Sequence, residues 1–263
     1  MTSAAGGNSR RRALRRLACL TALLAGYARA GGIPGVVVSE RSGCGFRQGV
    51  FLHGPRTGNR IALTFDVCPT SLRPAFTREV ADYLERARVP TTFFVSGLWA
   101  ESNPESFHRL IRVSFFEIAL HGHRHPRLRD ASAESIRAEI EDGRAALLRL
   151  GAAPAPLFRP PYFDLSPALV ATARQSGVVA ITGDAGLGDP DPYRSADVLE
   201  QDAIRWVQAG SVIVLHANGR GPGTAEAVRN LVPLLRRRGY DFVRASELVA
   251  ECRPPAAVAG VAD

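Results

Sequence analysis

A distorted parallel (β/α) barrel with about seven strands is the fold that the sequence predicts. Short, continuously apolar segments alternate with segments of helical periodicity, which is typical of a parallel sheet covered by helices. About seven such strand–helix units fit into about 200 residues, a spacing that favours a barrel over an open sheet. A chain of 263 residues that is 46% hydrophobic can bury one core of this size.

The predicted strands are short runs of β-branched, aromatic and aliphatic residues, as expected for buried strands. In chain order they are 36–38, 61–65, 91–95, 115–120, 157–159, 178–182, 211–215 and 241–243. The first of these precedes the barrel, and 157–159 runs into a proline-rich segment. A glycine- and aspartate-rich loop is predicted over 183–192.

The predicted helices lie between these strands and show a period near 3.6 residues. They cover 74–88, 104–112, 132–150, 166–175, 196–208 and 224–238, with a last turn from Ser246. Ser132 suits the N-cap of the longest helix, and Gly151 follows its end. Pro233 is awkward inside the helix 224–238, because proline lacks an amide hydrogen.

The first thirty residues have the pattern of an export signal peptide. They contain six arginines and no acidic residue, then the apolar run 17–25 and Ala28-Arg29-Ala30, which fits a cleavage site. Residues 9–15 resemble a twin-arginine signal. The apolar run is too short for a stable membrane span. We predict export to the periplasm or beyond, the alternative being an uncleaved membrane anchor.

Three segments follow the signal: an N-terminal extension over 31–58, the barrel over 59–252 and a disordered tail over 253–263. The net charge of the whole chain is +8, but residues 31–263 hold 27 basic and 25 acidic residues. This near-neutral body argues against nucleic acid as a partner. An oxidising compartment would permit one disulfide among Cys44, Cys68 and Cys252, with the pairing open.

Three of the six histidines lie within five residues, directly after the strand 115–120. His121 and His125 are four residues apart, so a helical turn or a compact loop would aim both rings at one point. Neutral imidazole is the commonest ligand for divalent metals such as zinc. We predict that His121 and His125 bind metal and that His123 points away. The alternative is an exposed basic loop.

Polar side chains recur where the predicted strands end, which is where parallel α/β folds place their sites. These residues are Asp66, His121 and His125, Arg159, Asp184 and Asp189, and His216. Each has a structural explanation as well: Asp66 as a helix cap, Arg159 in a surface ion pair, His216 as a hydrogen-bonded core histidine. Five strands ending in this way favour a shared site.

The order of these segments resembles the polysaccharide deacetylases of carbohydrate esterase family 4, the NodB-homology domain, over roughly residues 60–250. Five stretches carry the resemblance: TFDVCP at 64–69, similar to TFDDGP; HGHRHP at 121–126, with histidines four apart and a proline after them; RPPYF at 159–163, similar to RxPYG; the loop of Asp184 and Asp189, where DxxDW would lie; and GSVIVLH at 210–216, similar to a strand ending in LxH or LH. The stretches 188–192 and 216–221 resemble a proteobacterial branch whose first motif also lacks the second aspartate.

The resemblance implies a metal-dependent hydrolase that removes N-acetyl groups from a GlcNAc-containing glycan. It implies zinc, with cobalt or nickel as alternatives, bound by His121 and His125. The roles that it implies for the other residues are catalytic base for Asp66, catalytic acid for His216, tuning of His216 for Asp189, orientation of Asp66 for Arg159, and substrate binding and oxyanion stabilisation by the loop of Tyr162.

Val67 is the main departure from the family, because it stands where the first motif has its third metal ligand. Three alternatives follow: a two-histidine site completed by water, Cys68 as a thiolate third ligand, or Asp66 turned towards the metal. We favour the two-histidine site. Two other functions stay open, namely a non-catalytic glycan-binding protein and a hydrolase of another non-peptide C–N bond.

Overall fold

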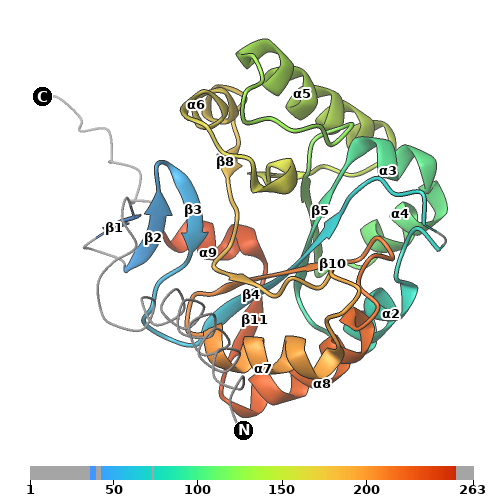
Figure 1. The fold of residues 1–263 in the computed structure, drawn as a ribbon, viewed down its shortest axis with the longest axis vertical. Coiled ribbons are helices and arrows are strands. Elements are labelled where there is room, and N and C mark those ends of the chain that lie inside the picture. Colours follow the sequence, from blue (N-terminus) through green and yellow to red (C-terminus); the bar gives the residue numbers. More distant parts are fainter. Residues whose placement is uncertain (1–35, 40–42, 73, 253–263) are drawn as a thin grey trace, which may run out of the picture. The chain divides into compact units, whose positions relative to one another are not determined.

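A parallel sheet of eight strands organises the computed structural model, which describes residues 36–39, 43–72 and 74–252 (Figure 1). The strands are β4 Arg60–Val67, β5 Thr91–Val95, β6 Phe116–Leu120, β7 Ala155–Phe158, β8 Val179–Ala180, β9 Ala185–Gly186, β10 Val212–His216 and β11 Asp241–Val243. Seven follow the order β8-β7-β6-β5-β4-β10-β9, and β11 pairs with the start of β4. The predicted signal peptide and tail lie outside the described residues.

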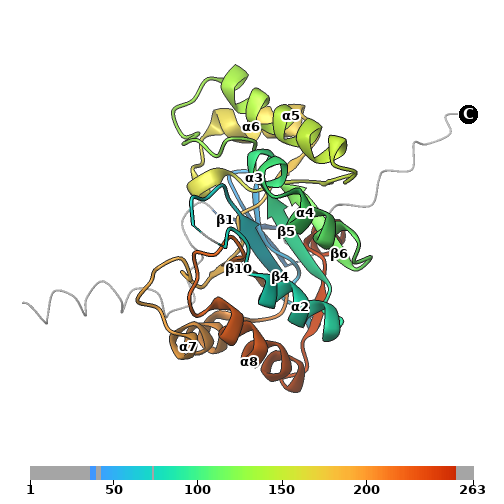
Figure 2. The ribbon, with the colours of Figure 1, turned by 90° about the vertical axis from the view of Figure 1, so that its right-hand side faces the viewer.

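Helices surround this sheet (Figure 2). They are α2 Arg78–Arg86, α3 Gly97–Ser102, α4 Pro104–Ile111, α5 Ala133–Arg149, α6 Pro167–Gln175, α7 Ala196–Trp206, α8 Thr224–Arg237 and α9 Ala245–Glu251, with a 3-10 turn η2 at Pro161–Phe163. Within the described residues no ladder joins β8 to β9, so the sheet curls into an incompletely closed barrel. The predicted distorted (β/α) barrel is confirmed.

Side chains of β4 alternate between two packed layers, as the two-residue period of a strand requires. Leu63, Phe65 and Val67 belong to the larger core cluster, which lies between the sheet and the helices. Ala62 belongs to the smaller cluster on the inner face of the sheet. Asp66 shares the parity of Ala62 and therefore lies at the C-terminal end of the inner face.

Four short elements differ from the sequence prediction: a helix and a strand in the barrel, and two strands of the N-terminal extension, Cys44–Arg47 and Val50–His53, where only 36–38 was predicted. Helix α3 was not predicted, because six residues beginning with glycine show too little periodicity; Ser96 caps it by accepting a hydrogen bond from Trp99. Strand β9 lies inside the predicted loop 183–192, where alanine and glycine have low strand propensity and pairing with β10 decides the conformation. The predicted cap is confirmed, since the Ser132 side chain accepts from the Ser135 amide. Helix α8 continues through Pro233.

Strands β1 Val36–Ser39, β2 Cys44–Arg47 and β3 Val50–His53 form a separate antiparallel sheet. Cys44 of β2 forms a disulfide with Cys252, which follows α9. Cys68 is a free, buried cysteine. The structure thereby decides the pairing that the sequence left open.

Opening the Cys44–Cys252 disulfide is expected to lower the free energy of unfolding by about 2–4 kcal/mol. The bond joins residues 208 positions apart and therefore restricts the unfolded chain strongly. Urea denaturation of the wild type and of Cys44→Ser measures the difference. Reductant should destabilise the wild type but leave the variant unchanged; equal midpoints for oxidised and reduced wild type would contradict the prediction.

In the part of the chain that the structure describes, no helix combines the length and the apolar composition that crossing a bilayer requires.

Candidate active site

The register of the sheet brings four predicted site residues to one end of neighbouring strands. Asp66 of β4 and His216 of β10 are register partners in adjacent strands. His121 follows β6, and Arg159 follows β7, which pairs with β6. Since all these strands are parallel, their C-terminal ends meet at the same edge and their polar side chains converge there.

Two imidazoles and a thiol form a compact cluster at this edge. The Nε2 atoms of His121 and His125 are 3.2 Å apart, and Sγ of Cys68 lies 3.4 Å from Nε2 of His121. The three donor atoms all lie within 4.8 Å of one another. His121 donates from Nδ1 to the carbonyl oxygen of Arg159 at 2.7 Å, so in the neutral ring Nε2 presents its lone pair to the cluster.

The electrostatics of the cluster couple its members. Burial would raise the pKa of the Cys68 thiol, but His121, with His125 and His216, outweighs burial and holds that pKa well below its ordinary value. Burial would lower the pKa of His121, yet Asp66 and Cys68 raise it above its ordinary value. Without a cation, these shifts favour a thiolate beside an imidazolium, the charge distribution that a divalent cation would replace on binding.

Asp66 and Arg159 form a buried ion pair beside the cluster. Arg159 donates to Oδ1 of Asp66 at 2.7 Å, while Oδ2 lies 3.9 Å from Nε2 of His121. Burial would raise the pKa of Asp66, but the guanidinium, helped by His121 and His216, outweighs it and keeps the pKa below its ordinary value. Arg159 is fully buried and lies 3.8 Å from the centre of the Phe94 ring. The arginine thus fixes both the charge and the orientation of the carboxylate.

His216 is held by a buried carboxylate of the loop before α7. Its Nδ1 donates to Oδ1 of Asp189 at 2.9 Å, and its backbone N–H donates to Oδ2 at 2.8 Å. The hydroxyl of Thr224 also donates to this carboxylate, at 2.6 Å. Burial would lower the pKa of His216, but the hydrogen bond and charge of Asp189, together with Cys68 and Asp66, outweigh it and the pKa rises to about 10.

Glu139 of α5 positions the histidine loop, a role that was not predicted from the sequence. Its Oε2 accepts the backbone N–H groups of His123, Arg124 and His125 at 2.7, 2.9 and 3.3 Å. His125 has a φ of 66°, which the loop must stabilise. The sequence offers one signal for this role: Glu139 lies among the apolar residues Ile136 and Ile140, on the face of the helix that the periodicity predicts to be buried.

Glu139→Gln is expected to weaken divalent-metal binding about 10- to 100-fold, the usual effect of losing a partner that orients metal ligands. In the wild type, backbone N–H groups of the histidine loop donate to the Glu139 carboxylate. The glutamine amide would replace one acceptor oxygen by an NH₂ group, which is itself a donor and cannot accept these bonds. Competition with a chromogenic chelator measures the affinity. Glu134→Gln, at the exposed first turn of the same helix, is the matched control, and equal affinities in the two variants would refute the orienting role.

Tyr162 lies next to the cluster and is 51% exposed. Its backbone has a φ of 57°. The ring packs edge-on against His125, with centres 4.6 Å apart, and the guanidinium of Arg127 stacks over it, 4.5 Å from the ring centre. Tyr162 therefore presents an aromatic surface to solvent beside the imidazoles, as its predicted substrate-binding role requires.

One residue of the predicted constellation, Asp184, lies apart from the site, and His123, which was not part of it, does so too. Asp184 accepts from Arg56 at 2.6 Å and from the Val212 amide at 2.8 Å, at the opposite end of β10 from His216. The ring of His123 lies against Gly97 of α3, where its Nδ1 would sit 2.5 Å from an added Cβ, so it points away from the cluster as predicted.

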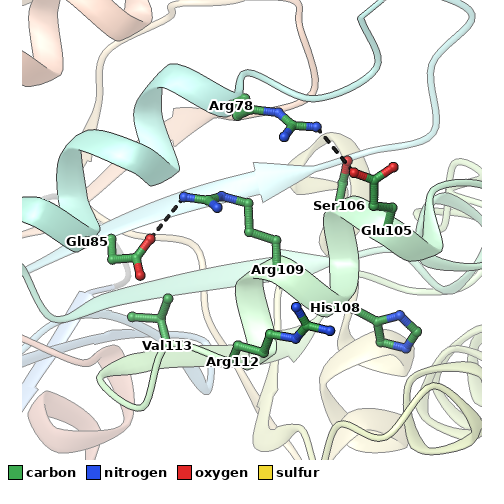
Figure 3. Close-up of a pocket in the computed structure, with 8 residues that line it drawn as sticks. All are labelled: Arg78, Glu85, Glu105, Ser106, His108, Arg109, Arg112 and Val113. Atoms are coloured by element: carbon green, nitrogen blue, oxygen red, sulfur yellow. Dashed lines mark hydrogen bonds and ion pairs between the residues drawn. The ribbon is translucent and has the colours of Figure 1, made fainter.

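A surface pocket between α2 and α4 contains none of the predicted site residues (Figure 3). Its charges largely neutralise one another: Arg109 pairs with Glu85 at 2.9 Å, and Arg78 approaches Glu105 at 3.7 Å. The candidate chemistry therefore lies at the strand ends.

Comparisons with known proteins agree on one family. Residues 53–181 match the profile of the family described as "Polysaccharide deacetylase". A chitooligosaccharide deacetylase from Sinorhizobium fredii is 30% identical over 204 residues, covering 71% of this chain and 91% of the relative.

Two solved structures share the fold. A family 4 acetyl xylan esterase from Clostridium thermocellum, in complex with a cobalt ion, superimposes with a TM-score of 0.64 at 30% identity, covering 73% of this chain and 90% of the other. A CE4 family pseudoenzyme from Bacillus anthracis gives a TM-score of 0.70 at 20% identity, covering 78% and 70%; at this identity the likeness concerns the fold alone.

Proposed function

Because the chain belongs to the polysaccharide deacetylase family, hydrolases of carbon–nitrogen bonds other than peptide bonds, we propose that it removes N-acetyl groups from a GlcNAc-containing glycan with a divalent cation. The observation that carries this proposal is the convergence of a base, an acid and a pair of imidazole donors at one sheet edge. Asp66, His216 and the pair His121 and His125 are these groups.

The donor atoms present fit a divalent cation. Two Nε2 atoms 3.2 Å apart, one of them on a ring whose Nδ1 is bound to a carbonyl oxygen, are typical of imidazole ligation. Nitrogen donors suit zinc, with cobalt and nickel as alternatives. When bound, the cation supplies Lewis acidity that polarises the acetyl carbonyl and lowers the pKa of water.

Asp66 is the catalytic base in this proposal. Arg159 occupies Oδ1 and keeps the carboxylate ionised, so Oδ2, which faces His121, accepts the proton of the attacking water. The buried guanidinium also fixes the direction of this oxygen. A base oriented in this way does not have to reorganise during the reaction.

His216 is the catalytic acid. Its bond to Asp189 holds Nδ1, so Nε2 delivers a proton to the departing amine nitrogen. The raised pKa of His216 keeps the ring protonated at neutral pH. Backbone N–H groups of the loop around Tyr162 stabilise the developing oxyanion, and the exposed Tyr162 ring packs against the sugar.

The test is acetate release from N-acetylglucosamine oligosaccharides, with metal analysis of the purified protein. We expect about one divalent ion per chain, loss of activity on chelation and its return with zinc or cobalt. His121→Ala should lose both ion and activity, whereas His108→Ala, a histidine of the remote pocket, should keep both. Activity that survives complete metal removal would refute the proposal.

Val67 favours one other function, a non-catalytic glycan-binding protein, because valine cannot act as the family's third ligand. Glycan affinity without acetate release, whichever metal is supplied, would establish it. Release of acetate or ammonia from small amides but not from oligosaccharides would instead indicate a hydrolase of another C–N bond. We also infer export, from the arginine-rich and apolar segments of residues 1–30.

A further inference from the structure

We propose that Cys68 is the third protein ligand of the cation, bound as a thiolate. The inference rests on the proposed metal site and names its donor set. It replaces our sequence-based preference for two histidines completed by water, because the structure places the sulfur of Cys68 beside both imidazoles.

The separations of the donor atoms can be compared with those of a tetrahedral site. Bonds of about 2.0–2.1 Å to nitrogen and about 2.3 Å to sulfur, at tetrahedral angles, set ligand atoms about 3.3 Å apart for N···N and about 3.6 Å apart for N···S. Two of the three separations agree with these values: the Nε2 atoms of His121 and His125 are 3.2 Å apart, and Sγ of Cys68 is 3.4 Å from Nε2 of His121. The third, from Sγ of Cys68 to His125, is within 4.8 Å. Only small movements would be needed to close this site around an ion.

The neighbouring residues cannot take the position of Cys68. Val67 has an apolar side chain that is fully buried in the core cluster between sheet and helices. The Asp66 carboxylate is held by Arg159 through Oδ1, and it falls outside the group of three donors. Cys68 follows Asp66 by two residues, is 4% exposed, and takes no part in the disulfide.

The thiolate would have two consequences for the site. It contributes one negative charge, as the carboxylate of the family's third ligand would. With three protein ligands, a tetrahedral cation keeps a fourth position for substrate or water. A soft sulfur ligand also shifts the preference towards zinc and cobalt and away from magnesium and manganese. Asp66 remains available as the base.

Cobalt substitution tests this ligand directly. Metal-free protein with its disulfide intact is titrated with Co²⁺, and the near-ultraviolet thiolate-to-cobalt charge-transfer band is recorded. We expect the band in the wild type and in the control His108→Ala, and its loss in Cys68→Ser. Loss of a residue that only orients a metal ligand lowers metal affinity about 10- to 100-fold. The zinc affinity of Cys68→Ser should fall by more than this, because a ligand itself is lost.

A second variant separates ligation from misfolding. Cys68→Asp should bind cobalt without the charge-transfer band and more tightly than Cys68→Ser, because its carboxylate restores a charged ligand. Stoichiometric cobalt binding by the wild type with no band, or unchanged zinc affinity in Cys68→Ser, would overturn the inference. The band without acetate release would refute only the proposed function, and acetate release without the band only the inference.

Discussion

Asp66→Asn is expected to lower the rate of acetate release about 10²- to 10⁴-fold, the usual contribution of a positioned general base. The amide cannot accept the proton of the attacking water, yet it keeps the shape of the side chain next to Arg159. Metal content should stay at the wild-type level, because Asp66 lies outside the group of three donors. Initial rates on N-acetylglucosamine oligosaccharides measure the effect.

Asp184→Asn is the matched control for this substitution. Its carboxylate also pairs with an arginine, Arg56, but at the opposite end of β10 from His216. The control should lose stability without losing the rate of acetate release per folded molecule. If Asp66→Asn were as active as Asp184→Asn, another group would have to be the base.

Asp189→Asn is expected to move the alkaline limb of the pH–rate profile to lower pH. A catalytic acid must carry its proton when the amine departs, so activity falls as pH rises through the pKa of His216. In the wild type that pKa is about 10, because Asp189, with smaller contributions from Cys68 and Asp66, outweighs burial. Loss of the charged partner lowers it towards its ordinary value, by at least about one unit.

The measurement is kcat/KM between neutral pH and the alkaline limit of folding, for the wild type and for two variants. Asp191→Asn is the control, since this exposed residue of the same loop bonds to the Tyr193 amide and not to His216. Its profile should match the wild type. An unshifted limb in Asp189→Asn would separate Asp189 from the titration of the acid.

The fold could be predicted from the sequence because its signals are local. Apolar strands such as 91–95 and periodic helices such as 132–150 report on burial within a few residues of chain. The weakest predictions concerned short elements: α3 and the two-residue strand β9 form because neighbouring segments pair with them or cap them. The match to the deacetylase family confirms the resemblance that the motifs indicated.

The residues of the candidate site could be predicted where a reactive side chain lies at the C-terminal end of an apolar strand. Asp66, His121 and His216 each follow or end an apolar strand, and parallel strands bring such positions together. Glu139 escaped because its partners are backbone amides of a distant loop, which leave no sequence pattern. Asp184 and Asp189 lie in the same loop, and the sequence gives no reason to prefer one of them for the site. The structure distinguishes them, because the Asp184 carboxylate pairs with Arg56.

By itself the sequence determined the barrel, its family and most of the polar residues of the candidate site, since periodicity and motif order are properties of neighbouring residues. Tertiary structure alone decided which cysteines join and which thiol faces the imidazoles. Cys44 and Cys252 lie 208 positions apart, and His121 lies 53 positions from Cys68. Contacts over such separations depend on how the sheet curls, because closing each loop costs entropy that only the complete core offsets.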